Sequence, residues 1–219
     1  AYTLQSKIAL TMTAALILIP GLFFFFFELD PSTSLSEHFL ISFFQSVTTR
    51  TAGYNTIDIK DFSETGRAAL IALMLIGGSP GSTAGGIKTT TAFILFAIMI
   101  ATFRLKKDPT CFSRRLSSET QRHAVTILMM YLLLFASGSV LLNLIDGIRL
   151  IDSAFETASA LGTVGLSIGV TDDLGPLSKY VMMLLMFFGR IGGLTVIFAA
   201  HAHSRQDSGR SPEERITIG

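Results

Sequence analysis

Four stretches of this chain are apolar enough, and long enough, to cross a lipid bilayer as helices. They cover residues 8–27, 68–103, 123–145 and 177–200. A spanning helix needs about 20 mostly apolar residues. Hydrophobic residues make up 49% of the chain and charged residues only 15%, which favours a membrane protein over soluble domains. We therefore predict an all-α integral membrane protein, because helices satisfy their own backbone hydrogen bonds in lipid.

Two shorter apolar segments lie between these spans, at residues 39–47 and 151–161. Each is too short to cross the bilayer, and each is followed by small residues. Segments of this length occur as buried, interfacial or re-entrant helices. Because each stands between two spans, we predict half-helices that enter the membrane and return on the same side.

The linker at residues 104–122 sets the expected orientation. It holds six basic and two acidic residues, whereas residues 28–67 hold three basic and six acidic, and residues 146–179 hold two basic and five acidic. The positive-inside rule places this linker in the cytoplasm. Both chain ends are then cytoplasmic, and both half-helices enter from outside. The single cysteine, Cys111, lies on the reducing side and is predicted to be an inert thiol.

The chain resembles itself at an offset of 112 residues, without a gap. The order of span, short segment, Thr-x-Gly and span occurs twice in the same orientation, which predicts two parallel repeats. The aligned positions are Phe43 with Phe155, residues 51–54 with 163–166, Gly77 with Gly189, and Gly81 with Gly193. The predicted divisions are a first pore repeat at 1–103, the basic linker at 104–122, a second pore repeat at 123–203 and a cytoplasmic tail at 204–219.

Each copy of Thr-x-Gly follows a half-helix and is a candidate cation site. Successive backbone carbonyls in such a loop can replace the hydration shell of a potassium ion. Glycine permits the backbone angles that this requires, and the carboxyl end of the half-helix carries partial negative charge. The alternative is a turn at the membrane edge. The candidate ion-binding residues are Thr51, Ala52, Gly53, Tyr54, Gly162, Thr163, Val164 and Gly165.

The second span is interrupted in its middle. Five glycines and a proline fall within ten residues, and in a helix interior they cost about 1 kcal/mol per glycine and about 3 for the proline. We predict two half-spans joined by a loop at membrane depth, which acts as a gate. The alternatives are a close-packed kink and a phosphate-binding loop, whose spacing fails because Ile87 separates Gly86 from Lys88. The candidate gate residues are Gly77, Gly78, Ser79, Pro80, Gly81, Ser82, Thr83, Ala84, Gly85 and Gly86, with Arg190.

Arg190 joins this set because it lies near the middle of the fourth span. An arginine in a membrane usually faces a cavity or a partner. The repeat offset places it opposite Gly78, so we predict that its guanidinium bonds to free carbonyls of the loop and holds the gate closed. The alternative is a structural arginine away from the pore. Lys88 is predicted to reach the cytoplasmic surface rather than to line the pore.

Four other polar residues leave alternatives open. Asp152 and Glu156 lie four apart and can share a helical face, either to attract cations and bond amides of the loop, or as a helix cap and an ordinary buried carboxylate. His201 and His203, at the end of the last span, are predicted to anchor it at the interface rather than to bind a metal, since the sequence offers no third ligand.

Four motifs resemble those of the Trk/Ktr/HKT superfamily of potassium transporters, and most closely its bacterial Ktr-type ion-translocating subunits. They are TTRTAGYNT (48–56), GGSPGSTAGGIKTTT (77–91), ALGTVGLS (160–167) and FFGRIGGLTV (187–196). The resemblance implies four span–pore–span repeats around one pore, of which this chain holds the third and fourth. It also implies that Gly53 and Gly165 set potassium preference. Tyr54 and Leu166 depart from the Tyr-Gly ending of tetrameric potassium channels.

The resemblance also implies the partners of the chain. These are an N-terminal half with two further pore repeats, a second copy in a homodimer, membrane lipid and a cytoplasmic nucleotide-binding ring that regulates transport. Potassium is the transported ion, sodium is a candidate activator, and no organic cofactor or nucleic acid is implied. A bacterial plasma membrane is the implied location.

The residues themselves leave two classes of transporter open. The leading class is a potassium-conducting pore, and the other is an ion-coupled secondary transporter with re-entrant loops. Proton-coupled carriers usually place acids inside their spans, and the four spans here hold none, which favours the pore. An enzyme is not expected, because the sequence offers neither a nucleophile with its base nor a metal cluster.

Overall fold

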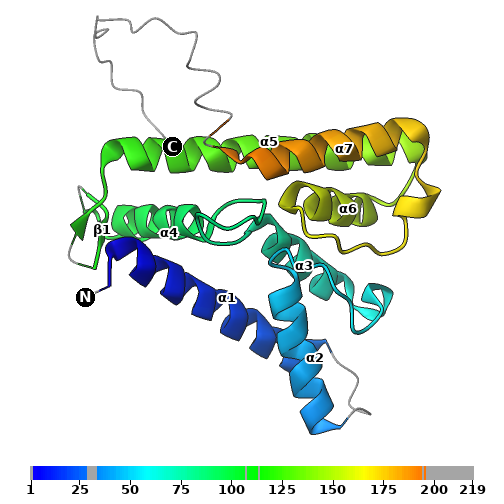
Figure 1. Ribbon diagram of the computed structural model, residues 1–219, viewed down its shortest axis with the longest axis horizontal. Helices are drawn as coiled ribbons and strands as arrows, with labels where there is room; N and C mark the ends of the chain where they lie inside the picture. Colours follow the sequence, from blue (N-terminus) through cyan, green and yellow to red (C-terminus); the bar gives the residue numbers. More distant parts are fainter. Residues whose placement is uncertain (1, 29–33, 107, 113, 194, 196–219) are drawn as a thin grey trace, which may run out of the picture.

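The helices of this chain account for most of the computed structural model, which describes residues 2–28, 34–106, 108–112, 114–193 and 195. Figure 1 shows them as long rods joined by short connections. In chain order they are α1 (Leu4–Phe27), α2 (Leu35–Thr48), α3 (Glu64–Leu75), α4 (Thr89–Phe103), α5 (Ser118–Asp146), α6 (Leu150–Gly162) and α7 (Pro176–Ile191). Two single turns of 3₁₀-helix, Ile59–Asp61 and Thr171–Asp173, precede α3 and α7.

Among the described residues, two helices are long and apolar enough to cross a membrane. They are α1, with 24 residues, and α5, with 29. The interrupted second span is divided between α3 and α4, so that α4 is a shorter apolar helix of 15 residues. In the fourth predicted span, α7 ends at Ile191, and residues 194 and 196–200 lie outside the described part of the chain. His201, His203 and the predicted tail also lie outside it.

Side-chain caps fix where several helices begin. The hydroxyl of Thr3 accepts a hydrogen bond from the Ser6 amide at the start of α1, and the hydroxyl of Ser117 accepts one from the Thr120 amide at the start of α5. Each cap satisfies an amide that has no partner within the helix. Gly147 ends α5 in the left-handed conformation, with φ of 67°, which glycine adopts without steric cost.

The short helix α6 is the most enclosed element of the structure. It packs against α3, α5 and α7, and Figure 1 shows it beneath α5 and α7. Its last seven residues, 156–162, are all buried. By contrast, α2 packs mainly on α1 and leaves Phe39, Leu40 and Phe44 exposed. The two half-helices predicted from the sequence therefore lie in different surroundings.

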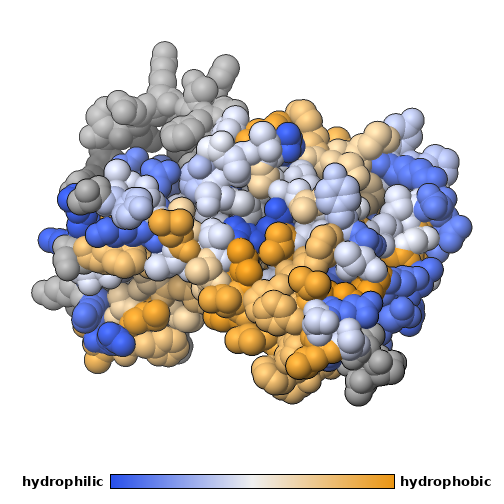
Figure 2. Space-filling view, turned by 60° about the horizontal axis from the view of Figure 1, so that its bottom comes forward, coloured by the Kyte–Doolittle hydropathy of each residue, from blue (hydrophilic) through white to orange (hydrophobic). Residues whose placement is uncertain are grey.

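Apolar side chains also cover much of the outer surface of the molecule. Figure 2 shows hydrophobic residues gathered in a broad central region, with hydrophilic residues at the right-hand edge. The exposed apolar side chains belong to α1, α4, α5 and α7, among other elements. Exposure of this extent fits helices that face lipid or another protein surface, and not a soluble monomer.

The basic linker contains a structure that the sequence did not predict. Strands β1 (Thr110–Cys111) and β2 (Arg114–Arg115) pair antiparallel, with Thr110 opposite Arg115. They form a small hairpin beside the amino end of α1 and the carboxyl end of α4 (Figure 1). The all-helical class is therefore correct only for the main elements.

Candidate functional site

The first Thr-x-Gly loop, residues 51–54, is separated from the end of α2 by two residues. Thr51 and Gly53 both have positive φ, at 69° and 75°. The buried hydroxyl of Thr48, in the last turn of α2, donates to the carbonyl of Tyr54 at 2.6 Å and accepts from the amide of Tyr54 at 2.9 Å. This pair of bonds closes the loop onto the end of its own helix. The Tyr54 side chain itself is exposed.

The second Thr-x-Gly loop, residues 162–165, is built in a similar way at the end of α6. Thr163 and Gly165 again have positive φ, at 52° and 96°. The hydroxyl of Ser159 accepts a hydrogen bond from the Gly165 amide at 3.2 Å, and its carbonyl accepts one from the Val164 amide at 2.8 Å. In both loops, a hydroxyl bonds to the amide six residues further along the chain. Sequence reasoning missed Thr48 and Ser159, although a hydroxyl in the last turn of each short helix was visible.

The two loops meet backbone to backbone. A Cβ atom added to Gly53 would lie 2.2 Å from the carbonyl oxygen of Val164, and one added to Gly165 would lie 3.8 Å from the Cα atom of Gly53. Both distances require the two backbones to pack side by side. The structure thus brings together the two loops that the sequence proposed as candidate cation sites, although they are 112 positions apart.

The glycine-rich loop, residues 77–86, lies between α3 and α4. Its base is closed by a short parallel bridge, in which the amide of Gly77 donates to the carbonyl of Ile87 at 2.8 Å. Gly77, Gly78, Gly85 and Gly86 are buried at this base, whereas Gly81, Ser82 and Thr83 are exposed at the tip. A Cβ atom on Gly77 would overlap the carbonyl oxygen of Gly85, at 1.8 Å. The loop follows a helix and not a strand, so it lacks the setting of a phosphate-binding loop.

Three successive residues of the glycine-rich loop, Thr83, Ala84 and Gly85, form hydrogen bonds with residues outside the loop. Arg190 of α7 donates a hydrogen bond from Nη1 to the carbonyl of Thr83, and Lys88 donates one from Nζ to the carbonyl of Ala84. The amide of Gly85 donates to the hydroxyl of Thr163 at 2.9 Å. The last bond joins this loop directly to the second Thr-x-Gly loop.

The predicted direction of the Lys88 side chain is wrong. It turns back to the glycine-rich loop and lies half-buried, rather than reaching the surface. The reason is local, because Ala84 lies four residues earlier and its carbonyl has no helical partner to bond.

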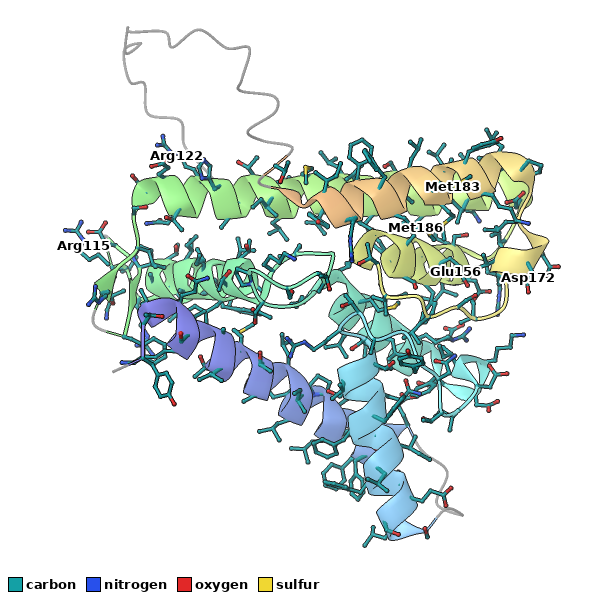
Figure 3. All side chains as sticks on the ribbon, in the orientation of Figure 1. Arg115, Arg122, Glu156, Asp172, Met183 and Met186 are labelled. Carbon is teal, nitrogen blue, oxygen red and sulfur yellow. The ribbon has the colours of Figure 1, made fainter. Side chains whose placement is uncertain are left out.

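Arg190 lies in a cavity of about 670 Å³ that borders the second Thr-x-Gly loop. Thr163, Val164 and Gly165 form part of its wall, and Met182 and Met186 of α7 line it opposite. Figure 3 shows Met186 between α7 and α6. The guanidinium therefore stands in a space beside the loop and is exposed, and is not enclosed in apolar side chains. An arginine in a predicted membrane span is expected to face a cavity.

Glu156 of α6 is a buried carboxylate that holds the segment after the second Thr-x-Gly loop. It is 2% exposed and accepts hydrogen bonds from the Ile168 amide at 3.1 Å and from the hydroxyls of Ser167 and Thr171, each at 2.7 Å. The predicted role as a buried hydrogen-bonding carboxylate describes this arrangement, whereas the amide that it binds belongs to Ile168 and not to the loop itself. Its side chain borders the same cavity as Arg190.

Asp152 does not cap α6, contrary to one of the two predicted roles. Its carboxylate forms ion pairs with Arg67 of α3 at 3.2 Å and with Arg149 at 2.8 Å. Arg67 was not singled out in the sequence, and it joins α3 to α6 from a position 85 residues away. Within the described ranges, no group of three or more His, Cys, Asp or Glu residues could hold a metal ion.

The two ends of the molecule differ in charge. Figure 3 places Arg115 and Arg122 at one end and Asp172 at the other, with Glu156 nearer the acidic end. The basic end also carries the β1–β2 hairpin and the amino end of α1 (Figure 1). The basic linker and the acidic segment that precedes α7 therefore lie at opposite ends of the molecule.

Comparison with known proteins gives concordant matches. A family profile described as TrkH, cation transport protein, matches residues 5–210. The potassium/sodium uptake protein NtpJ of Enterococcus hirae is 38% identical over 99% of this chain and 50% of its own length. The Ktr system potassium uptake proteins D and B of Bacillus subtilis are 34% and 33% identical over all of this chain, and over 49% and 50% of theirs.

A solved structure shares the fold. The potassium transporter TrkH from Vibrio parahaemolyticus superposes with a TM-score of 0.72 at 21% sequence identity, covering 89% of this chain and 43% of that one. This chain thus spans about half the length of the relatives that it matches.

Proposed function

This chain belongs to the TrkH family of cation transport proteins, and from that premise we propose that it forms half of a potassium-conducting pore. The observation that carries the proposal is the meeting of the two Thr-x-Gly loops, whose glycines pack backbone to backbone at the ends of α2 and α6. An N-terminal half with two further repeats completes the pore, because the relatives are about twice as long.

The proposed filter uses backbone carbonyls as ligands. Residues 51–54 and 162–165 each contain two positive-φ positions, which turn successive peptide groups out of helical alignment. Carbonyls presented in this way can replace water around a potassium ion. The carboxyl ends of α2 and α6 add partial negative charge beside the ion. The hydroxyls of Thr48 and Ser159 support the loops from behind, since they bond to backbone amides.

The proposed gate is the glycine-rich loop. It is attached to the second Thr-x-Gly loop through Gly85 and to α7 through Arg190. A loop at membrane depth requires cover by protein or water, and its polar tip fits a water-filled path. The positive charge of Arg190 next to that path repels cations while the loop is in place.

The remaining proposals concern the assembly. The two pore repeats are residues 1–103 and 123–203, with the basic linker and the tail in the cytoplasm of a bacterial cell. A nucleotide-binding ring docks on this side and regulates the gate, and two copies form a dimer in the plasma membrane. Potassium is the transported ion, with sodium as an activator. The uptake protein from Enterococcus hirae is described for both ions.

Anomalous diffraction tests the proposed filter directly. Crystals of the full-length protein, soaked in thallium or rubidium salts, are expected to show peaks on one axis beside the carbonyls of residues 51–53 and 162–165. An ordered pair of loops without such peaks would contradict the filter and favour an ion-coupled transporter with re-entrant loops.

Ion flux through variants of Arg190 tests the proposed gate. In proteoliposomes, Arg190→Ala is expected to raise flux in the absence of the regulatory subunit, since the carbonyl of Thr83 loses its partner. Arg190→Lys keeps the charge and is the matched control, with a smaller change. Flux that is unchanged in Arg190→Ala, with and without the regulatory subunit, would rule the gate role out.

A further inference from the structure

An apolar groove runs along α4 at the basic end of the molecule. Its cavity of about 310 Å³ is lined by Phe93, Phe96, Ala97 and Ile100, which recur at helical spacing, and by Cys111 and Phe112 of the hairpin segment. From Phe93 to Ile100 the helix rises about 10 Å. Half the hydrocarbon thickness of a bilayer is roughly 15 Å. The groove therefore has the length of a segment of acyl chain within one leaflet.

Cations surround the mouth of this groove. Arg104 and Lys106 line the cavity itself. A second cavity, of about 360 Å³, lies on the other side of Phe112 and is lined by Lys7 and Arg114. All four side chains are exposed, and within the described part of the chain none of them forms an ion pair.

Phe112 separates the apolar groove from the second cavity. Its ring stacks on that of Phe93 at 6.4 Å between centroids, and Lys7 lies over it at 5.8 Å. Its backbone lies in the left-handed region, with φ of 45°. The nearest acid on the hairpin, Asp108, is already paired with Arg115. Among the residues that the structure describes, the cations around the groove are thus not paired with an acid.

We propose that this groove binds an anionic phospholipid of the cytoplasmic leaflet, with one acyl chain along α4 and the phosphate among Arg104, Lys106, Lys7 and Arg114. The inference rests on the membrane location that belongs to the proposed function. Basic residues at the cytoplasmic end of a span attract anionic headgroups. The lining of the groove changes from apolar at Ile100 to cationic at Arg104, one helical turn later. A ligand with an apolar tail and an anionic head matches this change.

Tryptophan fluorescence offers a direct test, because these 219 residues contain no tryptophan. The full-length protein carrying Phe112→Trp is placed in phosphatidylcholine vesicles, and the unsubstituted protein serves as the blank. Either dibrominated phosphatidylglycerol or dibrominated phosphatidylcholine is then introduced as a quencher at equal mole fraction. We expect the anionic quencher to bind about fivefold more tightly or better, given the strength of one such cation near a membrane surface.

Phe103→Trp is the matched control. Phe103 lies at the end of the same helix with 83% of its surface exposed, so a tryptophan there meets bulk lipid and is quenched equally by both lipids. Arg104→Gln with Lys106→Gln, added to Phe112→Trp, is expected to remove the preference, whereas Arg122→Gln is expected to keep it. Ala97→Phe retains every charge but fills the groove, and is also expected to remove it.

Two results would overturn the proposal. Equal quenching of the tryptophan at position 112 by both lipids would mean ordinary lipid contact, and absence of quenching by either would mean that protein covers the groove. In both cases, quenching of the tryptophan at position 103 shows whether the protein is embedded in the membrane, so that a missing lipid site can be told apart from a wrong proposed function. A protein that shows no quenching at either position is not embedded as proposed, whereas a protein quenched only at 103 is embedded but has no such site.

Discussion

Gly53 is the residue at which one added carbon atom has the largest expected effect on ion selection. Its φ is 75°, which other residues rarely adopt, and a Cβ atom would lie 2.2 Å from the carbonyl oxygen of Val164. Gly53→Ala must therefore push one of the proposed ion ligands aside. We expect the preference for potassium over sodium to fall by about tenfold or more, because carbonyl placement sets selectivity.

The flux ratio of the two ions in proteoliposomes measures this effect. Gly165→Ala is the comparison. Its Cβ atom would lie 3.8 Å from the Cα atom of Gly53 without overlap, so that only the backbone conformation, with φ of 96°, would be strained. A smaller loss is expected there. If Gly53→Ala kept full selectivity while transporting normally, the contact between the loops would have no part in ion choice.

Cys111 gives a residue-scale prediction for the basic end of the molecule. The thiol is 6% exposed, and burial raises its pKa. Since only the thiolate reacts with maleimides, the raised pKa predicts slow labelling at neutral pH and a rate that keeps rising above the pH at which a free thiol levels off. A rate profile equal to that of glutathione would contradict the buried position.

At the scale of elements, the bond between Gly85 and Thr163 couples the proposed gate to the proposed filter. Thr163→Val removes the hydroxyl that accepts from the Gly85 amide and keeps the shape of the side chain. A buried amide left without an acceptor costs about 1–3 kcal/mol, so the glycine-rich loop is expected to loosen. The expected result is a higher basal flux together with lower selectivity.

Thr163→Ser retains the hydroxyl and is the control for this coupling. It is expected to behave as the unsubstituted protein in both measurements. Should Thr163→Val change selectivity but leave basal flux as it was, the two loops would act independently.

The three bonds of Glu156 connect α6 to the segment that precedes α7. Glu156→Ala leaves the buried Ile168 amide without its acceptor, which costs about 1–3 kcal/mol. The half-buried hydroxyls of Ser167 and Thr171 also lose their acceptor but still bond to each other at 3.1 Å. We expect a lower melting temperature in detergent for Glu156→Ala and a small change for Glu156→Gln, whose amide oxygen can still accept. Equal melting of both variants would show that the segment is held by packing alone.

Hydropathy and glycine content predicted several elements, and the repeat offset predicted the bond from Arg190 to a carbonyl of the glycine-rich loop, but other contacts between elements were not predicted. The lengths of α1 and α5, and the interruption before Thr89, follow from local composition. The Lys88 side chain, the hydroxyls of Thr48 and Ser159, and the ion pairs of Asp152 depend on which backbone groups are left without partners. Such groups become visible only when distant segments are placed together, as α3 and α6 are by Arg67.

At the scale of the whole molecule, the distribution of charge predicts the orientation in the membrane. Arg122 and Asp172 lie at opposite ends in Figure 3. Lysine and arginine are retained on the cytoplasmic side of a membrane, so the end with Arg122 is expected to face the cytoplasm. The segment with Asp172 follows the second Thr-x-Gly loop, which would then receive ions from outside the cell.

Cysteine labelling in intact cells tests this orientation. In a full-length protein whose native cysteines are replaced by serine, Asp172→Cys is expected to react with a maleimide that cannot cross membranes, and Arg122→Cys only after the membrane is permeabilised. Both side chains are exposed in the structure, so access by the reagent depends on the side of the membrane. If only Arg122→Cys were labelled in intact cells, the orientation would be the opposite of the one proposed. The lipid-binding groove would then lie in the outer leaflet, and Cys111 would not be in the reducing environment expected for it.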